Sequence, residues 1–449
     1  MKFTQSQQDA FDKFKQFISD PTKREMTIEG HAGTGKSFLT KSLIETVLQA
    51  QKIAQTVTKK QYKIKNIALT ATTNKATEVL RKVAYNLKEH ITISTVHALL
   101  DLKIYNDYKT GEQKLRLPTQ RVNLSNTLII VDEASMVNKQ LMSIINKAVD
   151  DTCKIVYILD AYQLAPVGET ECPVSTHIKT KSILTEIKRQ TLGNKDPIVE
   201  LAEKYRNVLD GAPFPTIPNN ISNIKRVNGD DFKSLVYTTF NLHTPGHIPD
   251  SNDDAQILAW TNSCVDSYNN YIREYYTNEK RLIEGESIIL NKPHIGNSGK
   301  IILPNECRVT VTESINQSYH FYCDVPYWAI TVKPAFNVHG DPNTWFTLRQ
   351  IQDNRIHSKK LREARSWGNK YNNWQTYFNL KDTFMSFRLP YASTIHKAQG
   401  STYDTVFINL TDIGRNHNPT EVARLMYVAL TRAKSQIYLY GNLGARYND

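Results

Sequence analysis

The segment Gly30-His31-Ala32-Gly33-Thr34-Gly35-Lys36-Ser37 restricts the possible folds of this chain more than any other segment. It matches the pattern G-x-x-x-x-G-K-[ST], between a predicted strand at 26–29 and apolar positions that recur at helical spacing from Phe38 to Val47. The glycines allow backbone N–H groups to curve around phosphate oxygens, and the start of the helix adds partial positive charge. We expect Lys36 to reach the β- and γ-phosphates of a nucleotide and the Ser37 hydroxyl to hold Mg²⁺. The alternative is a chance glycine-rich turn, which the strand–loop–helix context disfavours.

The rest of the first half alternates short apolar runs with helical patterns, which is typical of βαβ units around a parallel sheet. Strands are predicted at 66–70, 127–131 and 154–159, and helices at 76–83 and 136–149. The last two strand runs are continuously apolar, as strands buried on both faces should be. We therefore predict a first α/β domain over residues 1–190.

Polar side chains follow two of these predicted strands. Asp132 is placed to position Mg²⁺, and Glu133 to polarise an attacking water as general base. An acidic pair at a strand end can also be a solvated turn, but its position downstream of the phosphate-binding segment favours the catalytic role. Gln163 follows the next strand, at the edge where parallel sheets bind ligands, so it is a candidate sensor of the γ-phosphate. An ordinary turn is an equal alternative for that segment.

The second half predicts another α/β domain with an insertion. Residues 191–254, which are rich in Pro, Asn and Gly after 207, are expected to form a linker with irregular structure. Segments 255–284 and 390–449 would form the second domain. Residues 285–389 between them would form a small β-barrel followed by a helical arm at 358–380. Within the first domain, 101–117 predicts a β-hairpin.

Charge and composition limit the partners of the chain. Lys and Arg number 56 against 44 Asp and Glu, and this net charge of +12 favours a polyanion, either nucleic acid or an anionic membrane surface. The 23 tyrosines supply rings on which single-stranded nucleic acid can stack. No apolar run approaches the roughly 20 residues that span a bilayer, and no signal peptide is predicted. The five cysteines stand far apart, which argues against a disulfide framework or a zinc site and fits a reducing cytoplasm.

Two downstream segments carry further chemistry. STIHKAQG at 393–400 precedes a predicted strand, and YVALTRAK at 427–434 is predicted to be helical. Arg432 in the second segment is a candidate arginine finger, a cation that stabilises charge developing on the γ-phosphate. An isolated arginine is usually a solvated surface group, so only the whole set of motifs favours this role.

Taken in order, these segments resemble the motifs of superfamily 1 helicases, specifically the RecD-like branch that moves 5′→3′. Thr4-Gln5-Ser6-Gln7-Gln8-Asp9-Ala10-Phe11 resembles the Q motif of that family. Segments 71–76 and 94–97 resemble motifs Ia and Ib, and 184–190 resembles motif IV. Segment 260–263 resembles the start of the second motor domain, and 159–166, 393–400 and 427–434 resemble motifs III, V and VI. The resemblance covers nearly the whole chain.

The resemblance implies two RecA-like motor domains that bind ATP and Mg²⁺ between them. It assigns adenine recognition to Gln7, γ-phosphate contact to Arg189, and Gly400 to the nucleotide site. It assigns contacts with single-stranded DNA to motifs Ia, Ib and V and to segment 260–263, namely Thr72, Thr73, Asn74, Thr95, His97, Thr261, Asn262, Thr394, His396 and Lys397.

The implied activity is ATP-driven 5′→3′ translocation on single-stranded DNA and unwinding of forked or tailed duplexes by a monomer. Its context would be replication, recombination or repair, with a single-stranded-DNA-binding protein or other replication proteins as partners and no membrane. The hairpin at 101–117 would be the strand-separating pin, with Tyr105, Tyr108 and Leu115 as candidates for its apolar wedge. The basic segment 51–65 is expected to be a solvated loop, with an added DNA contact as the alternative.

The chain departs from the family pattern at Leu159 and Ala165, where Gly and Pro are usual, and at His31, where Pro is common. Two other classes of protein remain open. A P-loop kinase would need an acceptor site and a lid, but no second α/β domain that supplies Arg432. An ATP-gated DNA translocase or loader would have little reason to keep both Asp132 and Glu133. Among helicases, 3′→5′ polarity is the nearer alternative.

Overall fold

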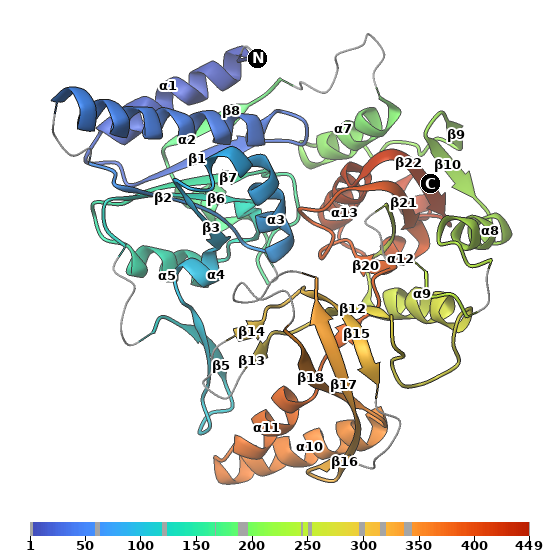
Figure 1. Cartoon of the computed structure of the whole chain (residues 1–449). Helices are drawn as coiled ribbons and strands as arrows, with labels where there is room; N and C mark the ends of the chain where they lie inside the picture. Colours follow the sequence, from blue (N-terminus) through green and yellow to red (C-terminus); the bar gives the residue numbers. More distant parts are fainter. Residues whose placement is uncertain are drawn as a thin grey trace.

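The structure is a computed structural model that describes residues 3–58, 63–118, 124–166, 168–186, 196–243, 246–249, 254–295, 301–314, 320–335 and 344–448. Two largely parallel sheets form the centres of two domains that lie side by side (Figure 1). An antiparallel sheet and two helices lie below them in this view. The predicted mixed α/β fold with parallel central sheets is therefore confirmed.

The first domain is built on a sheet with the strand order β3-β2-β6-β7-β1-β8, in which every neighbouring pair is parallel. The strands are β1 (Glu25–Gly30), β2 (Asn66–Ala71), β3 (Thr92–Thr95), β6 (Thr127–Asp132), β7 (Lys154–Leu159) and β8 (Lys181–Leu184). Four of these, β1, β2, β6 and β7, coincide with the predicted apolar runs to within a residue or so at each end. Burial on both faces is thus a reliable signal in this sheet.

Helices cover both faces of the first sheet. One face packs against α1 (Gln5–Ser19), α2 (Lys36–Ile53) and α3 (Asn74–Val83), and the other against α4 (Val96–Leu99), α5 (Lys139–Ala148) and α6 (Pro173–His177). Strand β6 shows how one apolar run serves two cores, because Leu128 and Ile130 face the first set of helices and Ile129 and Val131 face the second. The basic segment 51–65 begins as the end of α2 and a π-helical turn, Ala54–Thr58, and its residues 59–62 lie outside the described part.

The second domain has the strand order β20-β11-β21-β22-β10-β9, parallel except for the last pair. The strands are β9 (Asn220–Ile221), β10 (Ile224–Val227), β11 (Ala255–Ala259), β20 (Ala392–Thr394), β21 (Tyr403–Asn409) and β22 (Ala433–Tyr440). Its helices are α7 (Pro197–Leu209), α8 (Gly229–Thr239), α9 (Asn262–Glu274), α12 (Leu410–Gly414) and α13 (Pro419–Thr431). None of the described helices is long and apolar enough to cross a membrane.

The prediction of an irregular linker at 191–254 is wrong for most of its described residues. Helix α7 packs into the core of the second domain, and β10 pairs with β22 in its sheet. Two polar residues begin helices here: Asp196 caps α7 with Pro197 in its first turn, and Asn228, one of the residues that suggested a linker, caps α8. The second domain therefore begins at α7.

The inserted segment forms an antiparallel sheet in the order β16-β17-β15-β12-β19, with β18 also paired to β17. The strands are β12 (Ser287–Leu290), β15 (Arg308–Ser314), β16 (His320–Tyr322), β17 (Val325–Pro334), β18 (Phe346–Ile351) and β19 (Phe387–Arg388), and a separate ribbon pairs β13 (His294–Ile295) with β14 (Ile301–Leu303). Among the described strands no pairing closes this sheet, so it is an open sheet rather than the expected barrel. Helices α10 (Asn354–Tyr371) and α11 (Gln375–Thr383) form the helical arm.

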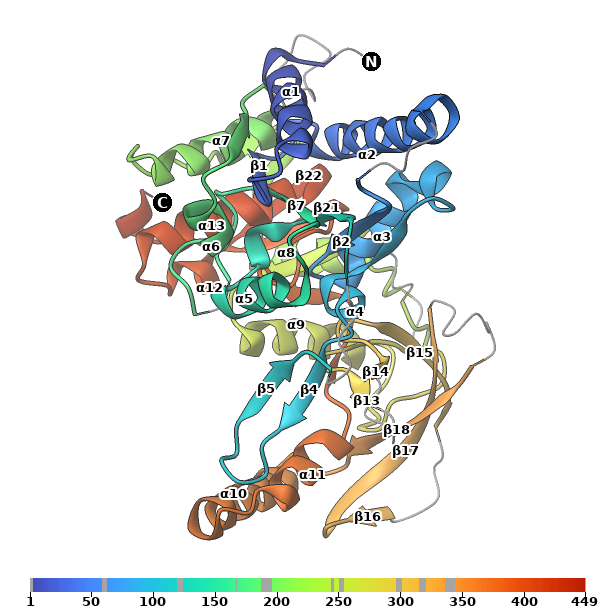
Figure 2. The ribbon, with the colours of Figure 1, turned by 90° about the vertical axis from the view of Figure 1, so that its left-hand side faces the viewer.

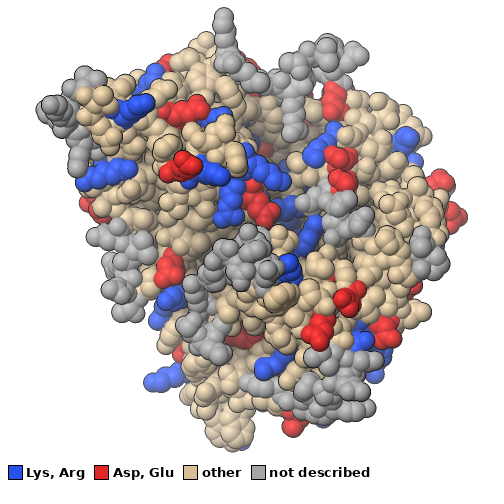
Figure 3. All heavy atoms as spheres, in the orientation of Figure 1, with Lys and Arg blue, Asp and Glu red and all other residues tan. Residues whose placement is uncertain are grey.

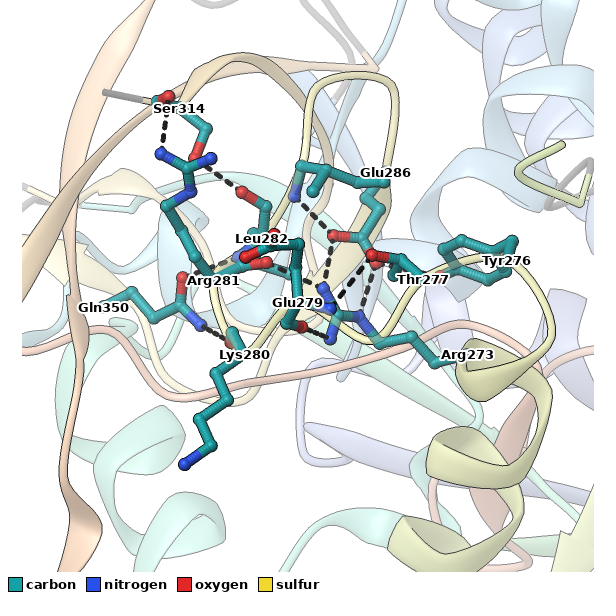
Figure 4. Close-up of polar contacts among 11 residues, drawn as sticks. Arg273, Tyr276, Thr277, Glu279, Lys280, Arg281, Leu282, Glu286, Ser314 and Gln350 are labelled. Atoms are coloured by element: carbon teal, nitrogen blue, oxygen red, sulfur yellow. Dashed lines mark hydrogen bonds and ion pairs between the residues drawn. The ribbon is translucent and has the colours of Figure 1, made fainter. Parts of the chain in front are cut away.

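A network of polar contacts joins α9 to this inserted sheet (Figure 4). The buried Glu286 carboxylate accepts from Arg273 Nε at 2.6 Å, from the Tyr276 hydroxyl at 2.9 Å and from the Ile283 backbone N–H at 2.7 Å. Gln350 of β18 accepts from the Leu282 N–H at 2.9 Å. These bonds fix the insertion to the second domain.

A two-stranded hairpin projects from the first domain toward the helical arm (Figure 2). Its strands β4 (Lys103–Asn106) and β5 (Gln113–Arg116) are antiparallel, within the predicted 101–117 segment. Trp374 N–H donates to Tyr108 O at 2.8 Å, and the Asn106 side chain donates to Asp382 Oδ2 at 2.9 Å. The end of the hairpin is therefore held by the arm.

Candidate nucleotide and nucleic-acid sites

The motif residues leave both parallel sheets at one edge. Gly30, Ala71, Thr95 and Asp132 are the last residues of β1, β2, β3 and β6, and Ala71 lies opposite both Thr95 and Asp132. In the second sheet Ala259 lies opposite Thr394. Because the carboxyl ends of parallel strands meet at one edge, the motif segments of each domain gather there.

The phosphate-binding segment forms the loop between β1 and α2. Gly33 and Gly35 have φ values of +86° and +79°, in the left-handed region that favours glycine. Lys36 Nζ donates to Gly30 O at 2.6 Å and to His31 O at 3.2 Å, so its ammonium lies across the mouth of the loop. The loop has the curved backbone and the cation that phosphate binding requires.

Gln7 packs against this loop from α1. Its side chain is fully buried, its Nε2 donates to Thr34 O at 2.8 Å, and its Oε1 accepts from Thr4 N–H at 3.2 Å. The Glu186 carboxylate accepts from the Gln5 and Ser6 N–H groups and holds the start of α1 in place. Hydrogen bonds from Ser6 and Thr4 lower the pKa of Glu186 to about 2. Gln7 is thus brought to the nucleotide loop, with both ends of its amide bonded to the protein.

Asp132 and Glu133 stand at the end of β6. Burial, and next the negative charge of Glu133, raise the pKa of the Asp132 carboxyl. Glu133 has a φ of +50°, which turns the chain sharply after the strand. A divalent cation would supply the positive charge that this half-buried pair needs, and a carboxylate with a hydroxyl is an oxygen donor set that suits Mg²⁺. The residues present, Asp132 and the exposed Ser37, therefore fit the expected metal.

The two domains meet directly over these carboxylates. A Cβ built on Gly400 would lie 3.9 Å from Glu133 Cγ and 3.5 Å from Ala76 Cβ. Gln399 Nε2 donates to Gln163 Oε1 at 3.4 Å, and both glutamines are buried. Lys and Arg side chains are concentrated near the middle of this face of the molecule, along the boundary between the domains (Figure 3). Motifs III and V are therefore in contact across the interface.

Arg432 is not brought to the phosphate-binding loop. Its buried guanidinium donates to Val428 O at 3.1 Å, Ser401 O at 3.0 Å and Thr431 Oγ1 at 3.0 Å, all within the second domain. Arg189, the other expected γ-phosphate contact, lies outside the described residues.

The expected DNA contacts of the first domain lie at the starts of α3 and α4. Thr73 Oγ1 accepts from Ala76 N–H, and Thr95 Oγ1 accepts from Ala98 N–H, so both cap helices while each hydroxyl proton can still be donated. Asn74 Nδ2 donates to Asn305 O of the insertion at 2.9 Å. Thr72 directly precedes Thr73 in the chain. In α4, burial lowers the pKa of His97.

In the second domain, Thr261 follows β11 and Thr394 ends the neighbouring parallel strand β20, so both lie at the carboxyl edge of that sheet. The Thr261 hydroxyl donates to Asp412 Oδ1 at 2.9 Å and accepts from Cys264 N–H, so it is committed to the fold, whereas the next residue, Asn262, is exposed. Thr394 Oγ1 accepts from Lys397 N–H at 3.4 Å. Burial lowers the pKa of His396.

Lys397 is held by a polar cluster that the sequence patterns do not reveal. Lys397 Nζ donates to Asn291 Oδ1 at 2.6 Å and lies 3.6 Å from a Glu306 oxygen. The same Glu306 carboxylate pairs with Arg388, which is also bonded to Asn291. The insertion therefore sets the position of the motif V lysine.

The three pin candidates have different surroundings. Tyr105 is 48% exposed, with the Arg116 guanidinium 4.4 Å from the centre of its ring. Tyr108 packs edge-on against Phe378 of the arm at 5.9 Å, and Leu115 packs against the core of the first domain. Only Tyr105 of the three is neither docked on the arm nor packed against that core.

Two domains with largely parallel sheets, the first with a phosphate-binding loop, meet through a contact between motifs III and V. This arrangement is that of nucleotide-driven motors with paired RecA-like domains. Known proteins agree: residues 16–169 match the AAA domain family, and residues 389–440 match the UvrD-like helicase C-terminal domain.

Whole-chain relatives make the assignment more specific. The chain is 27% identical over 481 residues to the ATP-dependent DNA helicase dda of Enterobacteria phage T4, covering 97% of this chain and 98% of that protein. It is 25% identical to the RecBCD enzyme subunit RecD of Buchnera aphidicola, covering 92% of this chain and 69% of that protein. A Bacteroides Pif1 helicase in complex with ADP-AlF3 and ssDNA has the same fold, with a TM-score of 0.50, 16% identity, and coverage of 100% of this chain and 94% of that one. The resemblance to superfamily 1 helicases of the RecD-like branch is confirmed, with Dda among the relatives.

Proposed function

We propose that this chain is an ATP-dependent DNA helicase that moves 5′→3′ on single-stranded DNA and unwinds tailed or forked duplexes. The observation that carries the proposal is the close approach of Gly400 to Glu133 across the domain interface, where a Cβ built on Gly400 would lie 3.9 Å from Glu133 Cγ. It sets a DNA-binding motif of one domain against the expected general base of the other. A change in the bound nucleotide would therefore alter the position of residues that would contact DNA.

The proposed roles follow from position. Lys36 would leave the Gly30 and His31 carbonyls for the phosphates, and Glu133 would polarise the attacking water. Mg²⁺ held by Ser37 and Asp132 would neutralise phosphate charge. Gln7, Arg189, Gln163 and Gly400 would complete the nucleotide site, and Arg432 would have to turn out of its own domain to serve as a finger.

The DNA would lie across the edges where motifs Ia, Ib and V emerge. Phosphate contacts would dominate its affinity, so binding should weaken steeply with salt. We infer that Tyr105, rather than Tyr108 or Leu115, is the wedge of the pin, because Tyr108 packs against Phe378 of the arm and Leu115 packs against the core of the first domain. By likeness to the T4 protein, we also propose a monomer that acts in replication, recombination or repair, encoded by a phage and present in the host cytoplasm.

The proposal is tested with two partial duplexes, one with a 5′ tail and one with a 3′ tail, in ATP and Mg²⁺. Hydrolysis is followed in the same reactions with and without single-stranded DNA. Displacement from the 5′-tailed substrate alone is expected. Displacement from the 3′-tailed substrate would reverse the polarity. Stimulated hydrolysis without displacement would favour a translocase or loader, and hydrolysis indifferent to DNA would favour a kinase.

A further inference from the structure

The Tyr427 hydroxyl of α13 reaches across the domain interface and bonds to two segments of the first domain. It donates to Asp160 Oδ2 at 2.6 Å and accepts from the Ala32 backbone N–H at 3.1 Å. Tyr427 is 3% exposed and Asp160 fully buried. One oxygen atom thus joins motif VI, motif III and the phosphate-binding loop.

The direction of both bonds is fixed by chemistry. A phenol has one proton, and burial, followed by the charge of Asp160, keeps the pKa of Tyr427 well above its usual value. That proton is given to the carboxylate, so the oxygen is left to accept from Ala32. The second Asp160 oxygen accepts from Tyr162 N–H at 3.1 Å. Loss of any partner would leave a buried polar group unpaired.

Ala32 lies in the loop whose N–H groups would surround a phosphate, next to the His31 carbonyl that accepts from Lys36. A change in this loop on nucleotide binding therefore alters a bond to the second domain. Three residues after Asp160, Gln163 contacts Gln399 of motif V, so the same segment also leads to the expected DNA contacts. Coupling between two sites is reciprocal, so the position of α13 must in turn affect nucleotide binding.

We propose that Tyr427 is a positioning residue that couples the phosphate-binding loop to the DNA-contacting segments of the second domain, acting through Ala32 and Asp160. The inference rests on the proposed function, and it adds to that function the atoms through which ATP and DNA sense one another. In this role Tyr427 contacts neither the nucleotide nor the DNA.

The test is the ratio of the hydrolysis kcat with saturating oligo-dT to the kcat without it. This ratio cancels a uniform loss of activity. Tyr427→Phe keeps the ring and removes both bonds, and it should lower the ratio by about tenfold, within the usual range of coupling between sites. Asp160→Asn keeps an acceptor for the hydroxyl but not the charge, so its loss should be smaller. The double variant should be no worse than Tyr427→Phe, because the two groups act as one unit.

The matched control is Tyr403→Phe. Tyr403 is also a buried tyrosine at the interface, and its hydroxyl accepts from Lys75 Nζ at 3.3 Å. This variant should keep the wild-type ratio. If it falls as far as Tyr427→Phe, general loosening of the interface is responsible and the inference is overturned.

The two proposals fail in different ways. A wild-type ratio of one would overturn the proposed function. A stimulated wild type together with an equally stimulated Tyr427→Phe would overturn the coupling role alone. If Tyr427→Phe does not fold by its melting transition, Asp160→Asn decides, and an unchanged ratio in that variant overturns the inference.

Discussion

Gly111 packs so closely against Trp374 that a Cβ built on Gly111 would be 2.4 Å from the indole Cδ2. Gly111 belongs to the turn of the hairpin and has a φ of +74°, while Trp374 precedes α11 of the arm. Two segments far apart in the sequence thus pack at backbone distance. This close approach fixes the direction in which the hairpin projects.

Gly111→Ala should separate the hairpin from the arm. The methyl group meets the rigid indole, and the left-handed backbone adds about 1–2 kcal/mol of strain. We expect unwinding of a 5′-tailed duplex to fall about fivefold, while DNA-stimulated hydrolysis stays within about twofold, since the loop lies outside the nucleotide site. The control is Gly211→Ala, which has a φ of +97° but nothing within 4 Å of the added methyl. Equal effects of both variants would show that backbone strain alone is responsible.

Tyr105→Ala should impair strand separation more than Tyr108→Ala. The Tyr105 ring is exposed and, unlike the Tyr108 ring, is not docked on Phe378, so it can stack on a base pair at the junction; stacking on a ring contributes about 1–3 kcal/mol. The measurement is the number of base pairs opened per ATP hydrolysed, expected to fall several-fold. Tyr85→Ala removes a tyrosine that is 63% exposed outside the hairpin and serves as the control. A larger loss in Tyr108→Ala would place the wedge at that residue instead.

The fold was predictable wherever local chemistry and tertiary structure agree. Strand β6 is one apolar run because it is buried on both faces, and Gly33 and Gly35 are required by their backbone conformation. The linker prediction failed because an Asn such as Asn228 begins a helix as readily as it interrupts one, and because α7 packs into the core of the second domain. The barrel prediction failed because turn spacing indicates strands but not whether the sheet closes.

The candidate site was predictable only in part, for a related reason. Motif residues such as Asp132 and Lys36 are marked by their neighbours in the chain. Tyr427 and Glu306 are marked only by what folding brings to them, Asp160 in one case and Lys397 in the other. Such pairings depend on how the chain folds back on itself, and no local sequence pattern indicates which distant residues will meet.

Lys36→Ala should lower the rate of ATP hydrolysis by about two to three orders of magnitude. Its ammonium is the cation of the phosphate-binding loop, and losing charge stabilisation of this kind costs about 3–4 kcal/mol or a factor of 10²–10³ in kcat. Lys41→Ala, on the exposed side of α2 near Glu45, removes a lysine from the same helix and should leave the rate unchanged. Wild-type turnover in Lys36→Ala would remove the nucleotide site from this loop.

Glu286→Gln should destabilise the junction between α9 and the inserted sheet. The carboxylate is fully buried and balances the Arg273 guanidinium, and breaking a buried ion pair from one side costs about 3–5 kcal/mol. We expect the first thermal transition to fall by several degrees, read by calorimetry. Glu284→Gln makes the same chemical change at an exposed position two residues away and should not shift it. An unshifted transition in Glu286→Gln would mean that hydrogen bonding to the amide replaces the ion pair.

Lys292 gives the stability a dependence on pH. Its ammonium donates to Lys381 O, and burial lowers its pKa to about 8, although Asp382 opposes the shift. The unfolded chain has the ordinary pKa near 10.5, so between about pH 8 and 10.5 it binds more protons than the folded chain and this group adds stability as pH rises. Below pH 8 both states are protonated and the full cost of burying the charge is present.

Lys292→Met removes that cost. The variant should melt at a higher temperature than the wild type at pH 7, by no more than the equivalent of about 3 kcal/mol, and the gain should shrink steadily from pH 8 to 10. Melting curves across this range are the measurement, with Lys280→Met, a change at an exposed lysine, as the control. A variant that is less stable than the wild type at pH 7 would show that the hydrogen bond to Lys381 O outweighs the cost of burying the ammonium.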